Sequence, residues 1–162
     1  MGELEQAMRQ AGMPVGLEPA TRAGRAVATH GKPRLEGVRV FTSSDGMTVL
    51  VGRTGPANHR LTFKLAAPED FWLHAQGSPG AHVVVRNDRR RPRPPDETLR
   101  EAAALAAWFS DSRDHEFADV QWTRRKYVRR PRGSAAGTVV LKRFETIRVR
   151  PGIPPAMGDA GS

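Results

Sequence analysis

One stretch of this sequence has the period of an amphipathic helix, and it stands among short runs of β-forming residues. From Asp96 to about Asp111, apolar side chains recur at the i, i+3, i+4, i+7 spacing of one helix face. Asp96 follows Pro95 and is predicted to cap the helix, with Glu97 near the positive end of its dipole. The stripe consists of Leu99, Ala102, Ala103, Ala106 and Phe109 or Ser110. Because most of these side chains are small, we expect the helix to lie close against one face of a β-sheet.

The runs around this helix have the character of strands. Apolar, β-branched and aromatic residues gather at positions 38–41, 47–51, 71–74, 82–86, 120–123, 127–128, 138–142 and 146–150. Asp45 and Gly46 lie between the first two runs, where an Asp-Gly pair indicates a hairpin turn. A shorter helix is expected to open near Pro56. The sequence therefore predicts a single α+β domain, with a mostly antiparallel or mixed sheet, one long Ala-rich helix packed on a face and one shorter helix.

The length of 162 residues suits one domain with ragged ends. We expect a flexible lead-in over residues 1–36, the domain over 37–150 and a disordered tail over 151–162. The chain has no cysteine, which excludes disulfides and thiolate metal sites. No apolar run approaches the ~18 residues of a membrane span, and the first residues lack the apolar core of a signal peptide. The expected location is the cytoplasm, with no membrane partner.

Positive charge is concentrated in one segment. Lys and Arg number 26 against 17 Asp and Glu, a net charge of +9. Between Gln121 and Arg150 there are ten basic residues and a single acid, Glu145, so this segment alone carries a net +9. A GC-rich genome also raises the arginine content, but it would spread the charge more evenly. The concentration favours a polyanionic partner.

Aromatic residues interleave with cations at the start of this segment, which places stacking planes beside phosphate partners. The candidate RNA contacts here are Trp122, Arg124, Lys126, Tyr127, Arg129, Arg130 and Arg132. Gly133 is expected to shape the turn that follows. The competing interpretation is a solvated strand edge whose charges deter pairing. Six cations in the nine residues 124–132 are more than such an edge needs, so we favour binding.

Two histidines, His74 and His82, flank a turn at Pro79 and Gly80. They can be structural, they can contact RNA, or they can act as an acid–base or metal pair. A metal would need a third ligand, and no carboxylate or histidine stands at a persuasive spacing, so no metal or other cofactor is expected. On the second interpretation, the RNA contacts of this region are Trp72, His74, His82 and Arg86.

Taken in order, these segments resemble the NFACT RNA-binding domain. This domain is the C-terminal module of the NFACT ribosome quality-control proteins, some of which are known as fibronectin-binding-protein-A-like. The resemblance covers roughly Phe41 to Val149 and is carried by residues 44–46, 51–53, 58, 61–66, 70–74, 79–83, 101–107, 126–133 and 137–139. This chain departs from the usual family pattern at Ala81 (commonly Ser), near His59 (an acid) and near Trp122 (Tyr).

The resemblance implies a non-catalytic module that contacts large-subunit rRNA and/or tRNA on stalled large ribosomal subunits. Full-length family members also have an N-terminal domain, a helix–hairpin–helix region and a long coiled coil, and here only Leu4 to about Gly12 resembles the end of that coiled coil. The remaining NFACT domains on another chain are therefore an expected partner. Two alternatives stay open: a small hydrolase or nuclease using His74 and His82, or a protein-interaction fragment of a split NFACT factor.

Overall fold

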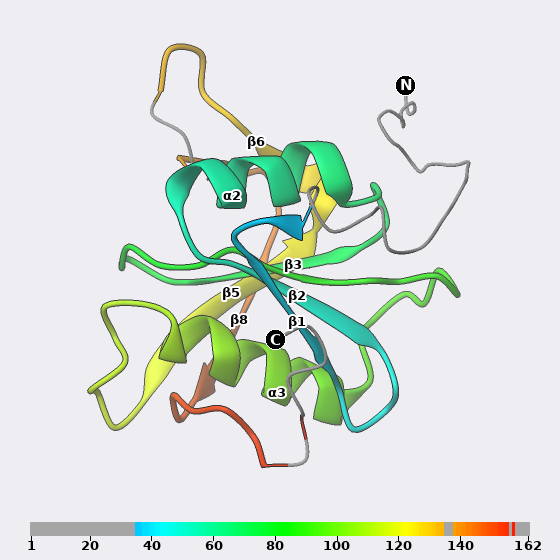
Figure 1. The fold of residues 1–162 in the computed structure, drawn as a ribbon, viewed down its shortest axis with the longest axis vertical. Helices are drawn as coiled ribbons and strands as arrows, with labels where there is room; N and C mark the ends of the chain where they lie inside the picture. Colours follow the sequence, from blue (N-terminus) through cyan, green and yellow to red (C-terminus); the bar gives the residue numbers. More distant parts are fainter. Residues whose placement is uncertain (1–34, 135–137, 156, 158–162) are drawn as a thin grey trace. The chain divides into compact units, whose positions relative to one another are not determined.

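A six-stranded antiparallel sheet forms the centre of the molecule in the computed structural model, which describes residues 35–134, 138–155 and 157 (Figure 1). In their order across the sheet, the strands are β1 (Val38–Thr42), β2 (Thr48–Gly52), β4 (Val83–Val85), β3 (Phe71–Ala75), β5 (Ala118–Arg124) and β8 (Glu145–Val149). Every neighbouring pair is antiparallel. The predicted α+β fold is confirmed. The predicted lead-in falls, except for its last two residues, outside the described part of the chain.

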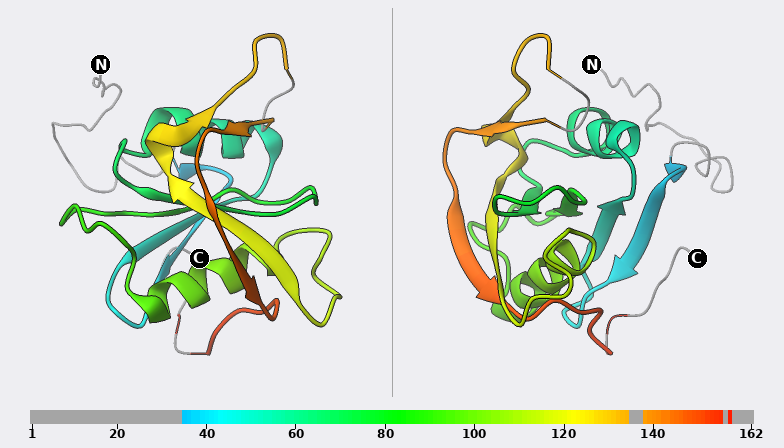
Figure 2. Two further views of the ribbon diagram at one scale, coloured as in Figure 1. Left: turned by 180° about the vertical axis from the view of Figure 1, so that it is seen from behind. Right: turned by 90° about the vertical axis from the view of Figure 1, so that its left-hand side faces the viewer.

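One face of the sheet is covered by the helix α3 (Asp96–Trp108), which packs through the predicted stripe (Figure 2). Ala102, Ala103 and Ala106 are fully buried against the sheet. Because these side chains are small, the helix backbone lies close to the strands, and the larger side chains of the sheet fill the space between. The helix has 13 residues and ends before the predicted Asp111, so it is shorter than expected.

The opposite face is covered by the short helix α2 (Gly55–Arg60), a π-helical turn η2 (Leu61–Leu65) that continues it, and a two-stranded ribbon (Figures 1 and 2). The ribbon consists of β6 (Val128–Arg129) and β7 (Val140–Leu141). Thr54 caps α2, because its hydroxyl oxygen accepts the N–H of Ala57 at 3.1 Å. A second apolar cluster forms under this layer from Leu50, Leu61, Trp72, Val84 and Val128. The sheet is therefore buried on both faces.

The β1–β2 turn caps α3 from a distance in the sequence. Gly46 in this turn has a φ of 84°, as the predicted Asp-Gly hairpin requires. The Oδ2 atom of Asp45 accepts the backbone N–H of Thr98 at 3.2 Å and its hydroxyl at 2.7 Å. The predicted cap, Asp96, is wrong: the N-cap position belongs to Pro95, and no side chain at that position bonds the helix. The hairpin supplies the carboxylate that the helix start needs.

The β3–β4 turn rests on the end of α3. Ala81 donates its N–H to the carbonyl of Phe109 at 2.9 Å, and Asp111 donates to Pro79 at 3.0 Å. A Cβ atom at Gly80 would lie 2.5 Å from the Cβ of Ser110, so only glycine permits this approach. The predicted turn residues Pro79 and Gly80 thus join two layers of the molecule.

Residues that follow β8 return to α3. Gly152 donates its N–H to the carbonyl of Ala104 at 3.3 Å, and Met157 is 2% exposed in the core under the helix. This part of the predicted disordered tail is therefore packed on the domain. Within the described residues, no helix has the length and apolar character needed to cross a membrane.

Candidate functional site

The basic segment leaves the sheet at the end of β5 and forms the ribbon over α2. The 3-10 turn η3 (Arg125–Tyr127) links β5 to β6, and Lys142 donates its N–H to the carbonyl of Tyr127 at 2.9 Å beyond β7. After β6, the chain projects from the body of the molecule as a loop (Figures 1 and 2). The fold therefore displays this part of the segment instead of burying it.

Acids from outside the segment neutralise some of its charge. Glu69 bonds Arg124 through Oε1 and Lys126 through Oε2, each at 2.8 Å. The hydrogen bond from Lys126 is the main reason why the pKa of Glu69 lies below its usual value. On β8, Arg148 pairs with Asp119 at 3.0 Å. The net charge counted along the sequence therefore overstates the charge that is available to a partner.

The end of β6 and the loop that follows it carry unpaired cations. Arg129, Arg130 and Arg132 are exposed, and within the described part of the chain none of them pairs with an acid. Gly133, with a φ of 77°, forms a turn in which Ser134 donates its N–H to the carbonyl of Pro131 at 3.2 Å. Arg130 donates to the carbonyl of Ser134 at 2.7 Å, which orders its guanidinium. The predicted turn at Gly133 thus holds a group of free cations together.

A groove beside the ribbon contains the half-buried ring of Tyr127. Lys126 lies 5.5 Å and Arg143 5.3 Å from the centre of this ring, and Arg143 donates to its hydroxyl at 3.4 Å. Phe144, which also lines the groove, is 49% exposed. The other lining residues are Pro92, Arg93, Trp122, Thr123, Arg124 and Glu145. A groove with cations beside exposed aromatic edges suits a nucleobase and its phosphate.

Trp122 does not share the exposure of Tyr127. It is 6% exposed, packs edge-on to Phe71 with 6.2 Å between ring centres, and is covered by the guanidinium of Arg93 at 5.0 Å. A base cannot stack on a ring that other side chains of the protein already cover. Trp122 is therefore a core residue, and it is not carried into the proposed binding surface.

Trp72 and His82 are held in the core by one hydroxyl group. Trp72 is fully buried and donates its Nε1–H to Thr62 Oγ1 at 3.0 Å. The same oxygen lies 2.8 Å from His82 Nδ1, and His82 is 1% exposed. The hydroxyl oxygen of Thr62 thus joins the two side chains, since it accepts from the indole and shares a hydrogen bond with His82 Nδ1. Both residues were predicted RNA contacts; both side chains are buried in the folded domain, and neither is carried into the proposed binding surface.

His74 lies at the edge of this cluster and lines a second groove. Its ring stacks on Trp72 and lies edge-on to His82, with 5.9 and 5.5 Å between ring centres. Burial lowers the pKa of His74, against the opposing effect of backbone hydrogen bonds at Gly80 and Ala75. The described residues contain no group of three or more His, Asp or Glu side chains placed to hold a metal ion. Of the two histidines of the hydrolase alternative, His74 lines this groove, whereas His82 is 1% exposed.

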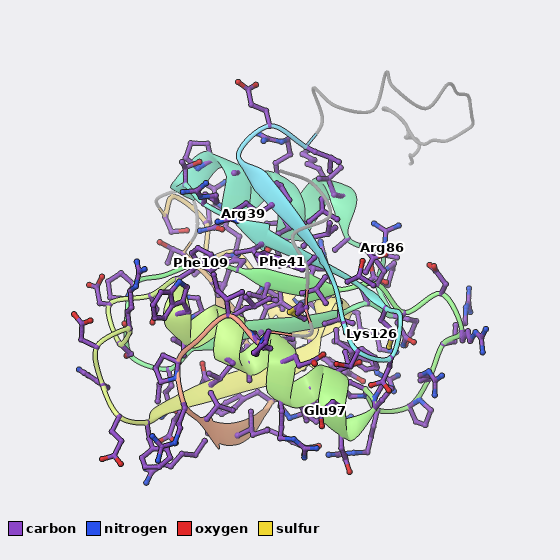
Figure 3. All side chains as sticks on the ribbon, turned by 60° about the horizontal axis from the view of Figure 1, so that its bottom comes forward. Arg39, Phe41, Arg86, Glu97, Phe109 and Lys126 are labelled. Atoms are coloured by element: carbon purple, nitrogen blue, oxygen red, sulfur yellow. The ribbon has the colours of Figure 1, made fainter. Side chains whose placement is uncertain are left out.

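Arg86 has a structural position. It pairs with the buried Asp70 at 3.5 Å and donates to the carbonyl of Leu65 at 3.3 Å, so it ties the end of β4 to the π-helical turn. Arg86 and Lys126 both appear toward one side of the molecule in Figure 3, and their acidic partners, Asp70 and Glu69, are consecutive in the sequence. Arg86, Arg124 and Lys126 each pair with an acid and are therefore less available to a ligand than Arg129, Arg130 and Arg132.

Two groove residues, Arg143 and Phe144, were not among the sequence-derived candidates. They are a cation next to an aromatic residue, which is the same pattern that singled out residues 122–133. The pattern could have found them. It could not show that they lie against Tyr127, since 16 positions separate Arg143 from that residue.

A displayed basic ribbon with an aromatic groove has the character of a nucleic-acid-binding module. Residues 37–143 match the model of the NFACT protein RNA binding domain, and the chain belongs to this family. Rqc2 homolog RqcH of Bacillus subtilis is 35% identical over 135 residues, which are 83% of this chain and 22% of that protein. Rqc2 homolog RqcH of Streptococcus suis is 37% identical over 112 residues, 68% of this chain and 20% of the relative.

A solved structure has the same fold. It is that of the C-terminal part of the fibronectin/fibrinogen-binding protein from Streptococcus suis, with a TM-score of 0.66 and 35% sequence identity. The match covers 71% of this chain and 45% of that one. The chain spans about a fifth of the length of the curated relatives described above.

Proposed function

We propose that this chain is a non-catalytic module that binds rRNA or tRNA on stalled large ribosomal subunits, as part of ribosome quality control. Membership of the RNA-binding family and the names of the relatives support this proposal. The chain corresponds to a small part of those relatives. We therefore propose that it supplies RNA contacts, and that other NFACT domains supply the other steps.

The observation that carries the proposal is the unpaired charge of the ribbon beside the aromatic groove. We define the RNA-binding surface as Lys126, Tyr127, Arg129, Arg130, Arg132 and Arg143. Arginine presents a planar fork that matches phosphate oxygens, and a half-buried tyrosine offers a ring face or edge to a base. Among the described residues, Arg129, Arg130 and Arg132 have no acid partner, so their binding to RNA breaks no ion pair within that part of the chain. His74, in the neighbouring groove, stays a candidate contact.

The test measures the affinity of the full chain for labelled tRNA and for purified large subunits over a range of salt. Neutralising Lys126, Arg129, Arg130 and Arg132 together with Gln should flatten the slope of log K against log salt by roughly two to three units, with the smallest share from Lys126, which pairs with Glu69. Binding should weaken alike for many RNAs, because phosphate contacts position the protein without reading sequence. A matched control replaces Arg100, Arg113, Arg148 and Arg150 with Gln and should keep most of the slope.

The aromatic residues provide a second arm. Tyr127→Leu should cost about 1–3 kcal/mol of binding free energy with the salt slope unchanged. Trp122→Leu should lower the thermal stability instead, because that ring is core. The labelled tRNA should stay intact with or without divalent metal. Unchanged affinity and slope in the quadruple Gln variant, or cleavage of the tRNA by the pure protein, contradicts the proposal.

A further inference from the structure

A turn in the loop between β4 and α3 is closed by one buried amide. Asn87 is 3% exposed, and its Oδ1 atom accepts the N–H of Arg91 at 2.8 Å. Its Nδ2 atom donates to the carbonyls of Arg91 and Glu69, both at 3.0 Å. The backbone N–H of Asn87 is in turn bound by the buried carboxylate of Asp70 at 2.8 Å. The buried residues Asn87 and Asp70 therefore fix the shape of the turn.

The tip of this turn holds an arginine in an unfavourable backbone conformation. Arg90 has a φ of 53°, and it is the one residue other than glycine with a positive φ in the described part of the chain. Glycine or asparagine adopts this conformation at less cost, whereas other residues lose about 1–2 kcal/mol there. A strained residue that the surrounding structure fixes is a reason to look for a function of its side chain.

The turn carries three unpaired cations. Arg89, Arg90 and Arg91 are exposed, and none of them pairs with an acid among the described residues. Asp88 is the single acid of the turn; it is exposed, and it forms no ion pair with another described residue. By contrast, Arg93 farther along the loop pairs with Glu145 at 3.2 Å. The unpaired arginines of this loop therefore lie in the part whose backbone is held by the hydrogen bonds of Asn87.

The loop leads from this turn directly into a wall of the aromatic groove. Pro92 and Arg93 line the groove on the side of the loop, while Tyr127 and Arg143 line it from the ribbon. Arg124 donates to the carbonyl of Pro92 at 2.7 Å, which fastens the loop to β5. The turn and the RNA-binding surface thus adjoin one groove.

We propose that Arg89, Arg90 and Arg91 form a second phosphate-binding element, which holds the backbone of the same RNA across the groove from Tyr127 and Arg143. This inference rests on the proposed function and adds a site to it. Arginine forks bind phosphate oxygens in pairs. Because the turn is already closed, little backbone order has to be gained when the RNA binds.

The experiment compares the full chain with the variant R89Q/R90Q/R91Q in tRNA binding over a range of salt. Loss of three phosphate contacts should flatten the slope by roughly two units and weaken binding at low salt by about tenfold or more. The control R100Q/R148Q/R150Q lowers the net charge equally at arginines that pair with acids elsewhere, and should keep most of the slope. R89K/R90K/R91K keeps the charges and should retain most of the binding.

Thermal unfolding of each variant is the control that tests whether the domain stays folded. Arg90→Asn should raise the stability slightly, because asparagine tolerates the left-handed conformation, while it weakens RNA binding. If the turn variant keeps the wild-type slope while the ribbon variant loses it, the second element does not exist and the proposed function stands. If both variants keep the slope, the proposed function itself is wrong. A loss as large in the arginine control means that net charge alone is responsible, which overturns the inference.

Discussion

At the scale of single residues, Thr62 supports two buried side chains through one hydroxyl group. Its hydroxyl oxygen is the hydrogen-bond partner of both Trp72 Nε1 and His82 Nδ1. Thr62→Val should therefore leave two buried polar groups unsatisfied and lower the free energy of unfolding by about 2–4 kcal/mol. Thr62→Ser keeps the hydroxyl and should cost about 1 kcal/mol for the lost methyl group. Urea unfolding measures both, and equal losses in the two variants would show that the hydroxyl has no special role.

His74 should make the domain less stable as the pH falls. Burial lowers the pKa of His74 in the folded state, so the unfolded chain takes up the proton more readily at this position. The stability that depends on neutral His74 should be present above the unfolded pKa of about 6.5 and be lost as the pH falls through it. His74→Gln should therefore lose less stability than the wild type between about pH 8 and about pH 5.

The pKa of His59 is lowered as well, chiefly by burial, and contributes a trend of the same sign. Since His59 is present in both proteins, the difference between the wild-type and His74→Gln curves isolates His74. Parallel curves, measured by urea unfolding at each pH, would show that His74 contributes nothing.

At the scale of elements, the junction between the β1–β2 hairpin and α3 decides how the helix is held. Asp45 binds the N–H and the hydroxyl of Thr98, whereas Asp96 bonds no backbone group of the helix start. Asp45→Ala should cost about 1–2 kcal/mol of stability as a lost cap. Asp96→Ala should cost only the weaker dipole contribution, about 0.5 kcal/mol. Asp45→Asn, which keeps an acceptor oxygen, should recover part of the loss. The opposite order of the two alanine variants would restore Asp96 as the cap.

The elements themselves could be predicted from local patterns, but their partnerships could not. The helical period over Leu99, Ala102 and Ala106 and the Asp-Gly turn are short-range signals, and both are confirmed. The cap from Asp45 crosses 53 positions of sequence, so no window of the helix contains it. The π-helical turn at residues 61–65 likewise depends on the packing of Leu61 against the sheet.

The candidate site could likewise be predicted only in part. Mixed aromatic residues and cations singled out the segment that carries the proposed surface, yet the pattern could not tell the half-buried Tyr127 from the buried Trp122 or Trp72. Because layers cover both faces of the sheet, successive residues of β3 are buried, and alternation along the strand no longer separates inside from outside. The pairing of Glu69 with Arg124 depends on the fold in the same way.

At the scale of the whole molecule, two displayed segments each carry three exposed arginines that pair with no acid among the described residues. One runs from the end of β6 into the loop after it, with Arg129, Arg130 and Arg132, and the other is the turn at 89–91. The remaining arginines of the basic segment on β5 and β8 are occupied by acids, as Arg124 and Arg148 show. A count along the sequence places the positive charge in one segment, residues 121–150. In the folded domain, part of that charge is paired with acids, and unpaired arginines also lie in the turn at 89–91.

The two ends of the chain should matter differently to the molecule as a whole. Residues 1–34 lie outside the described residues, and we predict that their removal leaves tRNA affinity within a few-fold, because the charged groups of the proposed surface lie at 89–143. Removal of residues 151–162 should also leave the affinity of the folded protein within a few-fold, but it should lower the free energy of unfolding by about 2 kcal/mol. The reason is Met157, which is 2% exposed against the core under α3.

Met157→Ala in the full chain should reproduce most of that loss, since it removes the same buried side chain and keeps the rest of the segment. Salt-dependent tRNA binding and urea unfolding, measured on the same three variants, separate the two effects. Loss of affinity with unchanged stability on removal of 1–34 would place the lead-in within the RNA-binding surface. Loss of affinity in Met157→Ala at a temperature where it is fully folded would mean that the C-terminal segment shapes the surface and does not only cover the core.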